Sequence, residues 1–136
     1  MSETIESLEL KRKELFRRLT RVGDFRRGNV SELRRRCGKK NCACAQPTHP
    51  GHPRYLWSTT RGSKSEALNL RPGPEMEKVV VEVDNYKAFL ELTREIVEVN
   101  EKICQLRPVR QVEDEEQLEA MKKKLQRRFA RKRSRK

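Results

Sequence analysis

The sequence predicts an α+β protein: a long antiparallel, coiled-coil-like helical pair with an inserted Cys/His knuckle and a small β-hairpin, followed by a basic C-terminal helix and tail. Two long segments carry apolar residues at helical spacing, and a segment between them has the composition of strands. A dense group of cysteines and histidines precedes that segment. We therefore divide the chain into residues 1–106 (helical pair, knuckle and hairpin), 107–131 (linker and amphipathic helix) and 132–136 (basic disordered end).

The composition limits the size of any hydrophobic core. Of the 136 residues only 34% are hydrophobic and 5% aromatic, so long amphipathic helices or a metal staple must supply stability. No apolar run approaches the ~20 residues of a membrane span, and the polar, acidic N-terminus does not resemble a signal peptide. We expect a soluble, cytoplasmic protein, and its charge is compatible with association with the nucleoid.

The first helix is predicted from Ser2 to Val22. Ser2 suits the N-cap position, and Gly23 ends the helix. The apolar residues that recur at three-, four- and seven-residue steps are Ile5, Leu8, Leu15, Phe16, Leu19 and Val22. The pattern over residues 24–36 is short and ambiguous, with a turn indicated at Gly28-Asn29.

A β-hairpin is predicted next. Residues 54–60 are rich in β-branched and aromatic side chains, residues 61–64 supply a turn, and residues 65–70 form the return strand. A two-stranded hairpin is marginal in water, so it needs the knuckle or the helices as backing.

The second helix is expected to start at Pro74 and run to about Leu106, with the first helix as its antiparallel partner. Its main apolar stripe comprises Val79, Val83, Tyr86, Leu90, Val97 and Ile103, and it is widened by Met76, Val80, Phe89, Ile96 and Cys104. A third helix is predicted over residues 114–131, and its apolar residues, Leu118, Met121, Leu125 and Phe129, have no obvious partner within the chain.

The knuckle is the segment from residue 37 to residue 52, with the pattern Cys37-x4-Cys42-x-Cys44-x4-His49-x2-His52. Three thiolates and one imidazole held by Gly and Pro turns are suitable ligands for tetrahedral zinc. His52 or His49 is the fourth ligand, and His52 is preferred because it lies just before the next predicted strand. The alternatives are reduced structural thiols in a tight turn, with Gly38 at positive φ, and disulfide or redox chemistry. Three thiolates also suit an iron–sulfur cluster, although no feature favours it over zinc.

Basic residues are concentrated on both sides of an acidic segment. Residues 11–36 hold eleven Lys or Arg against three acids, and the last fifteen residues hold ten and no acid. Residues 73–121 reverse this balance, with six bases and thirteen acids. Clustered Lys and Arg bind a phosphate backbone through counterion release, so DNA or RNA is the expected partner. The candidate contacts are Arg26, Arg27, Arg34, Arg35, Arg36, Lys39, Lys40, Arg127, Arg128, Arg131, Lys132 and Arg133.

Tyr55 and Trp57 offer a stacking surface for an unpaired base, with burial in the core as the alternative. No nucleophile–base pair or carboxylate constellation appears, so we expect no catalysis and no small-molecule substrate. The function we predict is a non-enzymatic, zinc-stapled nucleic-acid-binding accessory protein. The competing hypotheses are a protein-interaction module that self-associates or docks on a partner through its helices, and a metal- or redox-responsive regulator. A membrane surface is the least favoured partner.

The knuckle resembles an uncharacterised family of small bacterial proteins, commonly encoded near transposases and other mobile elements. The family pattern is CGKxxCxC, a variable turn, HGPY with further aromatics, a Gly-Lys hairpin turn and a helix with an Asn-based motif. The matching residues are Cys37, Gly38, Lys39, Cys42, Cys44, His52 and Tyr55, with Asn85-Tyr86 resembling the helix motif. The chain departs from the pattern at His52-Pro53-Arg54 and at Gly62-Ser63-Lys64. The resemblance extends over residues 5–106, favours His52 as the fourth ligand, and implies a mobile-element setting with a transposase as a partner.

Overall fold

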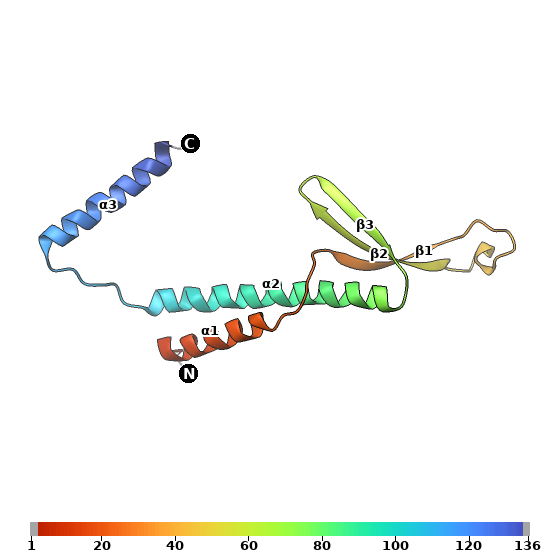
Figure 1. Cartoon of the computed structure of the whole chain (residues 1–136), viewed down its shortest axis with the longest axis horizontal. Helices are drawn as coiled ribbons and strands as arrows, with labels where there is room; N and C mark the ends of the chain where they lie inside the picture. The colour runs from red at the N-terminus through yellow and green to blue at the C-terminus, as the bar shows by residue number, and fades with distance from the viewer. Residues whose placement is uncertain (1–2, 135–136) are drawn as a thin grey trace. The chain divides into compact units, whose positions relative to one another are not determined.

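The computed structural model describes residues 3–134, with side chains described as far as residue 132 (Figure 1). The chain divides into two compact units, residues 1–104 and 105–136. The elements are α1 (Ile5–Thr20), β1 (Asn29–Arg35), the 3-10 turn η1 (Ala43–Ala45), β2 (His52–Arg61), β3 (Lys64–Leu70), α2 (Pro74–Leu106) and α3 (Glu115–Ser134). The mixed α and β architecture expected from the sequence is confirmed.

Helix α1 begins with a capping box. The side-chain oxygen of Thr4 accepts a hydrogen bond from the backbone N–H of Ser7, and the Ser7 side-chain oxygen accepts one from the backbone N–H of Thr4, each at 3.1 Å. These contacts satisfy N–H groups that have no partner within the helix. Ser2, the N-cap that the sequence suggested, lies outside the described residues.

Helix α1 packs against the C-terminal half of α2 and runs in the opposite direction (Figure 1). At one end, Glu3 pairs with Lys102, and at the other the amide of Asn85 donates to the carbonyl of Asp24. The buried residues between the helices are Leu8, Leu15, Leu92, Ile96, Val99 and Ile103. The antiparallel helical pair is therefore present, while its coiled-coil character stays a prediction.

The buried face of α2 differs from the stripe that the sequence indicated. Leu90 and Val97 are 47% and 53% exposed, whereas Leu92 and Val99, two positions further along, are buried. Both pairs have the seven-residue spacing of a helix face, so periodicity alone cannot choose between them. The position of α1 decides which stripe is covered.

The sheet has three antiparallel strands in the order β1-β2-β3, so the predicted two-stranded hairpin is incomplete. The hairpin itself and its turn are correct, with Arg61 paired to Lys64 across a two-residue loop and Gly62 at a φ of 58°. Strand β1 comes from the segment that the sequence left ambiguous, because its charged residues mask the alternation of a strand. Its partner β2 lies across the knuckle, so the pairing is non-local.

The inner face of the sheet packs on the N-terminal half of α2. Its buried residues Trp57 and Leu70 meet Val79 and Val83 of α2. Trp57 is only 8% exposed, and its indole N–H donates to the carbonyl of Arg27 at 2.9 Å. Gly28, at a φ of 122°, lies so close to this indole that a Cβ atom would meet Nε1 at 2.5 Å. A glycine is therefore required where the chain enters β1.

The second unit contains α3, which extends to Ser134, beyond the limit of residue 131 expected from the sequence. None of the described side chains of α3 is buried, and Leu118, Leu125 and Phe129 are 41%, 51% and 58% exposed. Among the described residues, no helix is both long and apolar enough to cross a membrane.

The packing of α1 on α2 leads to a prediction about stability. Leu15→Ala should lower the free energy of unfolding by about 2–5 kcal/mol, because it removes a buried side chain from the α1–α2 core. Leu10→Ala, at a residue 70% exposed on the same helix, should change it by less than about 0.5 kcal/mol. Urea denaturation followed by circular dichroism measures both, and equal losses would contradict the assignment of the core.

Candidate metal centre

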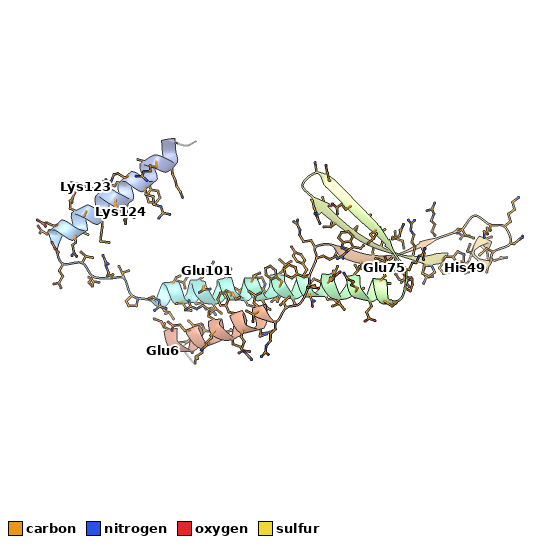
Figure 2. All side chains as sticks on the ribbon, in the orientation of Figure 1. Glu6, His49, Glu75, Glu101, Lys123 and Lys124 are labelled. Carbon is orange, nitrogen blue, oxygen red and sulfur yellow. The ribbon has the colours of Figure 1, made fainter. Side chains whose placement is uncertain are left out.

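The sheet register positions the knuckle. Arg35, the last residue of β1, pairs with His52, the first residue of β2, so the intervening residues form a loop closed at its base. Gly51 closes this loop at a φ of 96°, where a Cβ atom would meet the backbone of Arg35 at 3.1 Å. Gly38 has a φ of 83°, which confirms the positive φ expected from the sequence. Figure 2 labels His49 in this loop, at the end of the sheet away from α1.

The closed loop brings four side chains together. One ligand atom each from Cys37, Cys42, Cys44 and His52 lies within 4.8 Å of the other three. The sulfur atoms of Cys37 and Cys44 are 3.4 Å apart, and the sulfur of Cys42 lies 3.1 Å from Nε2 of His52. We refer to these four residues as the Cys/His cluster.

The spacing of the Cys/His cluster fits a metal ion. Cysteine sulfur binds zinc at about 2.3 Å, so ligand atoms at the corners of a tetrahedron lie roughly 3.8 Å from one another. The separations in the cluster, from 3.1 Å to the 4.8 Å limit, bracket this value. The four side chains could therefore hold a metal ion after small rotations.

His49, the alternative fourth ligand, has a different role. Its Nδ1 accepts a hydrogen bond from the backbone N–H of Gly51 at 2.9 Å, and its ring centroid lies 5.9 Å from that of His52. This bond fixes the turn immediately before β2. The structure brings His52 into the Cys/His cluster and leaves His49 outside it.

The thiols of the Cys/His cluster differ in acidity. Hydrogen bonds from the backbone N–H of Lys39 and from Cys44 lower the pKa of Cys37. The backbone N–H of Cys44, with the side chains of Cys44 and His52, lowers the pKa of Cys42. For Cys44, a hydrogen bond from the backbone N–H of Cys37 lowers the pKa, but burial and the neighbouring thiols outweigh it and raise the pKa. The two more exposed thiols thus ionise first, and thiolates are the form that binds metal.

Arg36 organises the backbone of the knuckle. Its Nη1 donates to the carbonyls of Cys44 and Gln46 at 2.9 and 3.0 Å, and its Nη2 to those of Pro47 and His49 at 3.3 Å. The sequence placed Arg36 among the phosphate contacts, whereas the structure uses its guanidinium to hold one side of the loop. A run of three arginines carries no local signal that would distinguish this role.

Two other arginines also have partners within the protein. Arg34 donates to the carbonyl of Gly51 at 3.1 Å and pairs with Glu32 at 2.9 Å. Arg26 pairs with Glu82 at 2.9 Å and lies over the ring of Trp57. Lys78 also binds Glu82, and this bond together with Arg26 lowers the pKa of the Glu82 carboxyl.

The remaining candidate contacts near the Cys/His cluster are exposed: Arg27, Arg35, Lys39 and Lys40. Trp57 is a core residue and Tyr55 is half-buried against the same core, so the core alternative describes both better than an open stacking surface. Among the C-terminal candidates, Arg127, Arg128, Arg131 and Lys132 lie on α3 in the second unit, and the side chain of Arg133 lies outside the described residues.

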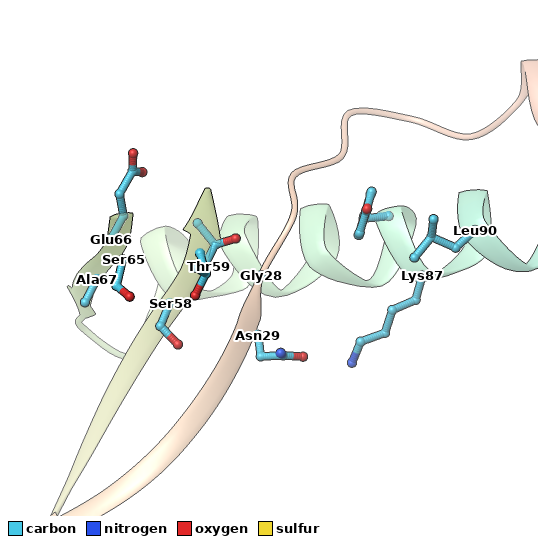
Figure 3. Close-up of a pocket in the computed structure, with 11 residues that line it drawn as sticks. Gly28, Asn29, Ser58, Thr59, Ser65, Glu66, Ala67, Lys87 and Leu90 are labelled. Carbon is cyan, nitrogen blue, oxygen red and sulfur yellow. The ribbon is translucent and has the colours of Figure 1, made fainter. Parts of the chain in front are cut away.

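A groove of about 570 Å³ lies elsewhere in the first unit, between the hairpin and α2 (Figure 3). Lys87 and Leu90 of α2 line one side, and Ser58 and Thr59 of β2 line the other. No residue of the Cys/His cluster lines the groove, so the two features are separate.

Comparison with known families covers about the first half of the chain. Residues 5–70 match the model of a domain of unknown function, DUF6788. The DUF6788 match takes in α1, the whole sheet and the Cys/His cluster, and ends at the last residue of β3. The match therefore stops before α2, whereas the resemblance described from the sequence extended to residue 106. No curated protein and no solved structure matches the chain.

Arg36 provides a test of how the knuckle is held. Arg36→Met should raise the labelling rate of Cys44 by a thiol reagent in metal-free protein, because Cys44 is 1% exposed and its carbonyl is bound by Arg36. We expect an increase of about tenfold or more, since one hydrogen bond to a charged donor contributes about 1.5–3 kcal/mol. Arg35→Met is the matched control and should leave the rate unchanged. Mass spectrometry of the labelled peptides measures both rates, and equal labelling would contradict the role of Arg36.

Proposed function

We propose that the chain is a non-enzymatic nucleic-acid-binding protein whose contact region is stapled by zinc. The observation that carries this proposal is the Cys/His cluster closing a loop that bears exposed basic residues. A bound ion would fix the end of β1 and the start of β2 relative to each other. The basic side chains on both segments would then be presented on a rigid surface instead of a flexible loop.

Zinc is the metal that the donor set favours. Three thiols and one imidazole are soft and intermediate donors, which suit zinc better than magnesium or calcium. Four protein ligands complete a tetrahedron and leave no position for an activated water. The proposed ion is accordingly structural, which supports the assignment of a non-enzymatic role.

Nucleic acid is the partner that the charge favours. The chain carries a net charge of +13, and the exposed bases Arg35, Lys39 and Lys40 lie at or inside the knuckle. Phosphate groups bind such side chains with release of counterions. The resemblance of the knuckle to proteins encoded near transposases supports an accessory role at a mobile element, which we include in the proposal.

The metal is tested first. Purified, tag-free protein should contain one zinc ion per chain, and Cys42→Ser and His52→Ala should each lose it. His49→Ala should retain the ion, because His49 lies outside the Cys/His cluster and acts through the backbone of Gly51. Elemental mass spectrometry measures the content. Metal-free wild-type protein after growth with zinc would refute the staple.

Nucleic-acid binding is tested by its dependence on salt. If about four phosphates of a single strand are contacted, log K should fall with log salt with a slope of about −3. Lys39→Ala combined with Lys40→Ala should make this slope shallower by about 1.4 and weaken binding, because two contacts near the Cys/His cluster are lost. Lys11→Ala with Lys13→Ala removes the same charge from exposed positions on α1 and should have little effect. Fluorescence anisotropy with labelled oligonucleotides gives both quantities, and no binding at low salt would refute the function.

One observation favours a second function, a protein-interaction module. The apolar residues of α3 are exposed throughout its described length, and a helix with an uncovered apolar stripe often docks on another helix. This module would use α3 and the coiled-coil-like helical pair, and its basic residues would be incidental. Sedimentation distinguishes the two functions, because self-association through α3 gives a concentration-dependent mass that Leu125→Glu abolishes.

A further inference from the structure

The two faces of the sheet differ in charge. Directly paired residues share a face, so the register assigns every strand residue to the inner face against α2 or to the opposite, outer face. Both acidic residues of the strands, Glu32 and Glu66, belong to the inner face, because Glu32 pairs with Tyr55 and Glu66 with Thr59. The residues of the outer face are Asn29, Ser31, Leu33, Arg35, His52, Arg54, Leu56, Ser58, Thr60, Ser65, Ala67 and Asn69. None of them carries a carboxylate.

Near the knuckle, the outer face is open within the described part of the chain. Towards the hairpin turn it borders the groove next to α2, whose lining includes the outer-face residues Asn29, Ser58, Thr60, Ser65 and Ala67. All of its residues are exposed or half-buried, and Leu33 is 48% exposed. Leu33 pairs directly with Arg54, and the next row towards the knuckle pairs Arg35 with His52. An apolar side chain therefore lies between two arginines on a surface without negative charge.

The arginines of this face are placed by the fold. Nε of Arg54 donates to Oδ1 of Asn69 at 2.9 Å, which ties β2 to β3 and leaves the two terminal nitrogens of the guanidinium for a ligand. Arg34, Arg35 and Arg36 are all exposed, but the guanidinium groups of Arg34 and Arg36 bind carbonyls of the knuckle, whereas Arg35 makes no such described bond. Alternation along β1 thus places Arg35 on the outer face and Arg34 on the inner face, while Arg36 follows the end of the strand. His52 belongs to the Cys/His cluster, so a bound ion would hold this end of the face in place.

We propose that the outer face of the sheet is a binding surface for single-stranded nucleic acid. This inference rests on the proposed function. It assigns nucleic-acid binding to the outer face of the sheet instead of to all of the basic clusters together. Arg35 and Arg54 contact phosphates, and Leu33 with Leu56 contacts the faces of unpaired bases. A duplex keeps its bases stacked and paired, so these apolar side chains would have no base face to contact. The exclusion of carboxylates from the outer face matches the negative charge of the ligand.

The test compares two double variants that remove the same charge from opposite faces of one sheet. Arg35→Ala with Arg54→Ala alters the outer face, and Arg61→Ala with Lys64→Ala alters the inner side of the hairpin end. Anisotropy with oligo(dT) and oligo(rU) of about 12 nucleotides, and with a DNA duplex of equal length, measures affinity. We expect the outer variant to lose about tenfold or more in single-strand affinity and the inner variant less than about threefold. Leu33→Ala should also weaken single-strand binding while leaving duplex binding unchanged.

The outcomes separate the surface from the function. Equal losses in both double variants, or a larger loss in the inner one, would overturn the outer face while leaving nucleic-acid binding intact. Tighter binding of the duplex would overturn the preference for single strands. Wild-type protein that binds none of the probes at low salt would refute the proposed function as well. Because Arg54 also contacts Asn69, the single variant Arg35→Ala provides a second measurement that breaks no described hydrogen bond, and it should lose affinity by itself.

Discussion

Helix α2 supplies apolar surface to two separate cores, and the rest of the first unit depends on this shared contact. Its N-terminal half covers the inner face of the sheet through Val79 and Val83, and its C-terminal half packs on α1. A chain with 34% hydrophobic residues cannot build a large core around a sheet alone. Helix α2 buries a different stripe of residues along each half. It thereby stabilises both α1 and the sheet and joins them in one unit. The family match to residues 5–70 therefore covers elements whose buried faces are completed by residues beyond it.

The Cys/His cluster depends in turn on the sheet. Cys37 and His52 are far apart along the chain, and they meet because Arg35 pairs with His52 at the ends of β1 and β2. Arg36 holds the outer part of the loop through backbone carbonyls, and Gly51 permits the close approach at its base. The ligands are thus positioned by backbone pairing before any ion contributes. An ion would add a further constraint where the sheet is otherwise unsupported by the helices.

The arginines show how one residue type takes different roles within a few positions. Arg26 is held between Glu82 and the ring of Trp57, and Arg34 and Arg36 bind carbonyls of the knuckle. Arg35, between the latter two, makes no described side-chain hydrogen bond and is exposed, as its two neighbours are. Successive strand residues point to opposite faces, so Arg34 and Arg35 of β1 reach different surroundings, and Arg36 follows the end of the strand. Net charge in the sequence therefore overstates the number of side chains that are available to a polyanion at this end of the molecule.

The sequence by itself determined the local features: the two long helices, the turn at Gly62, the positive φ at Gly38, and the set of cysteines with a histidine that could hold an ion. These follow from spacing, from glycine, and from ligand chemistry, all of which act over a few residues. Only the tertiary structure decided that β1 joins the sheet and that Leu92 and Val99, instead of Leu90 and Val97, belong to the buried face of α2. Each of these depends on a partner distant in sequence. Such a partner chooses between alternatives that are locally equivalent, and for that reason the pattern along the chain could not distinguish them.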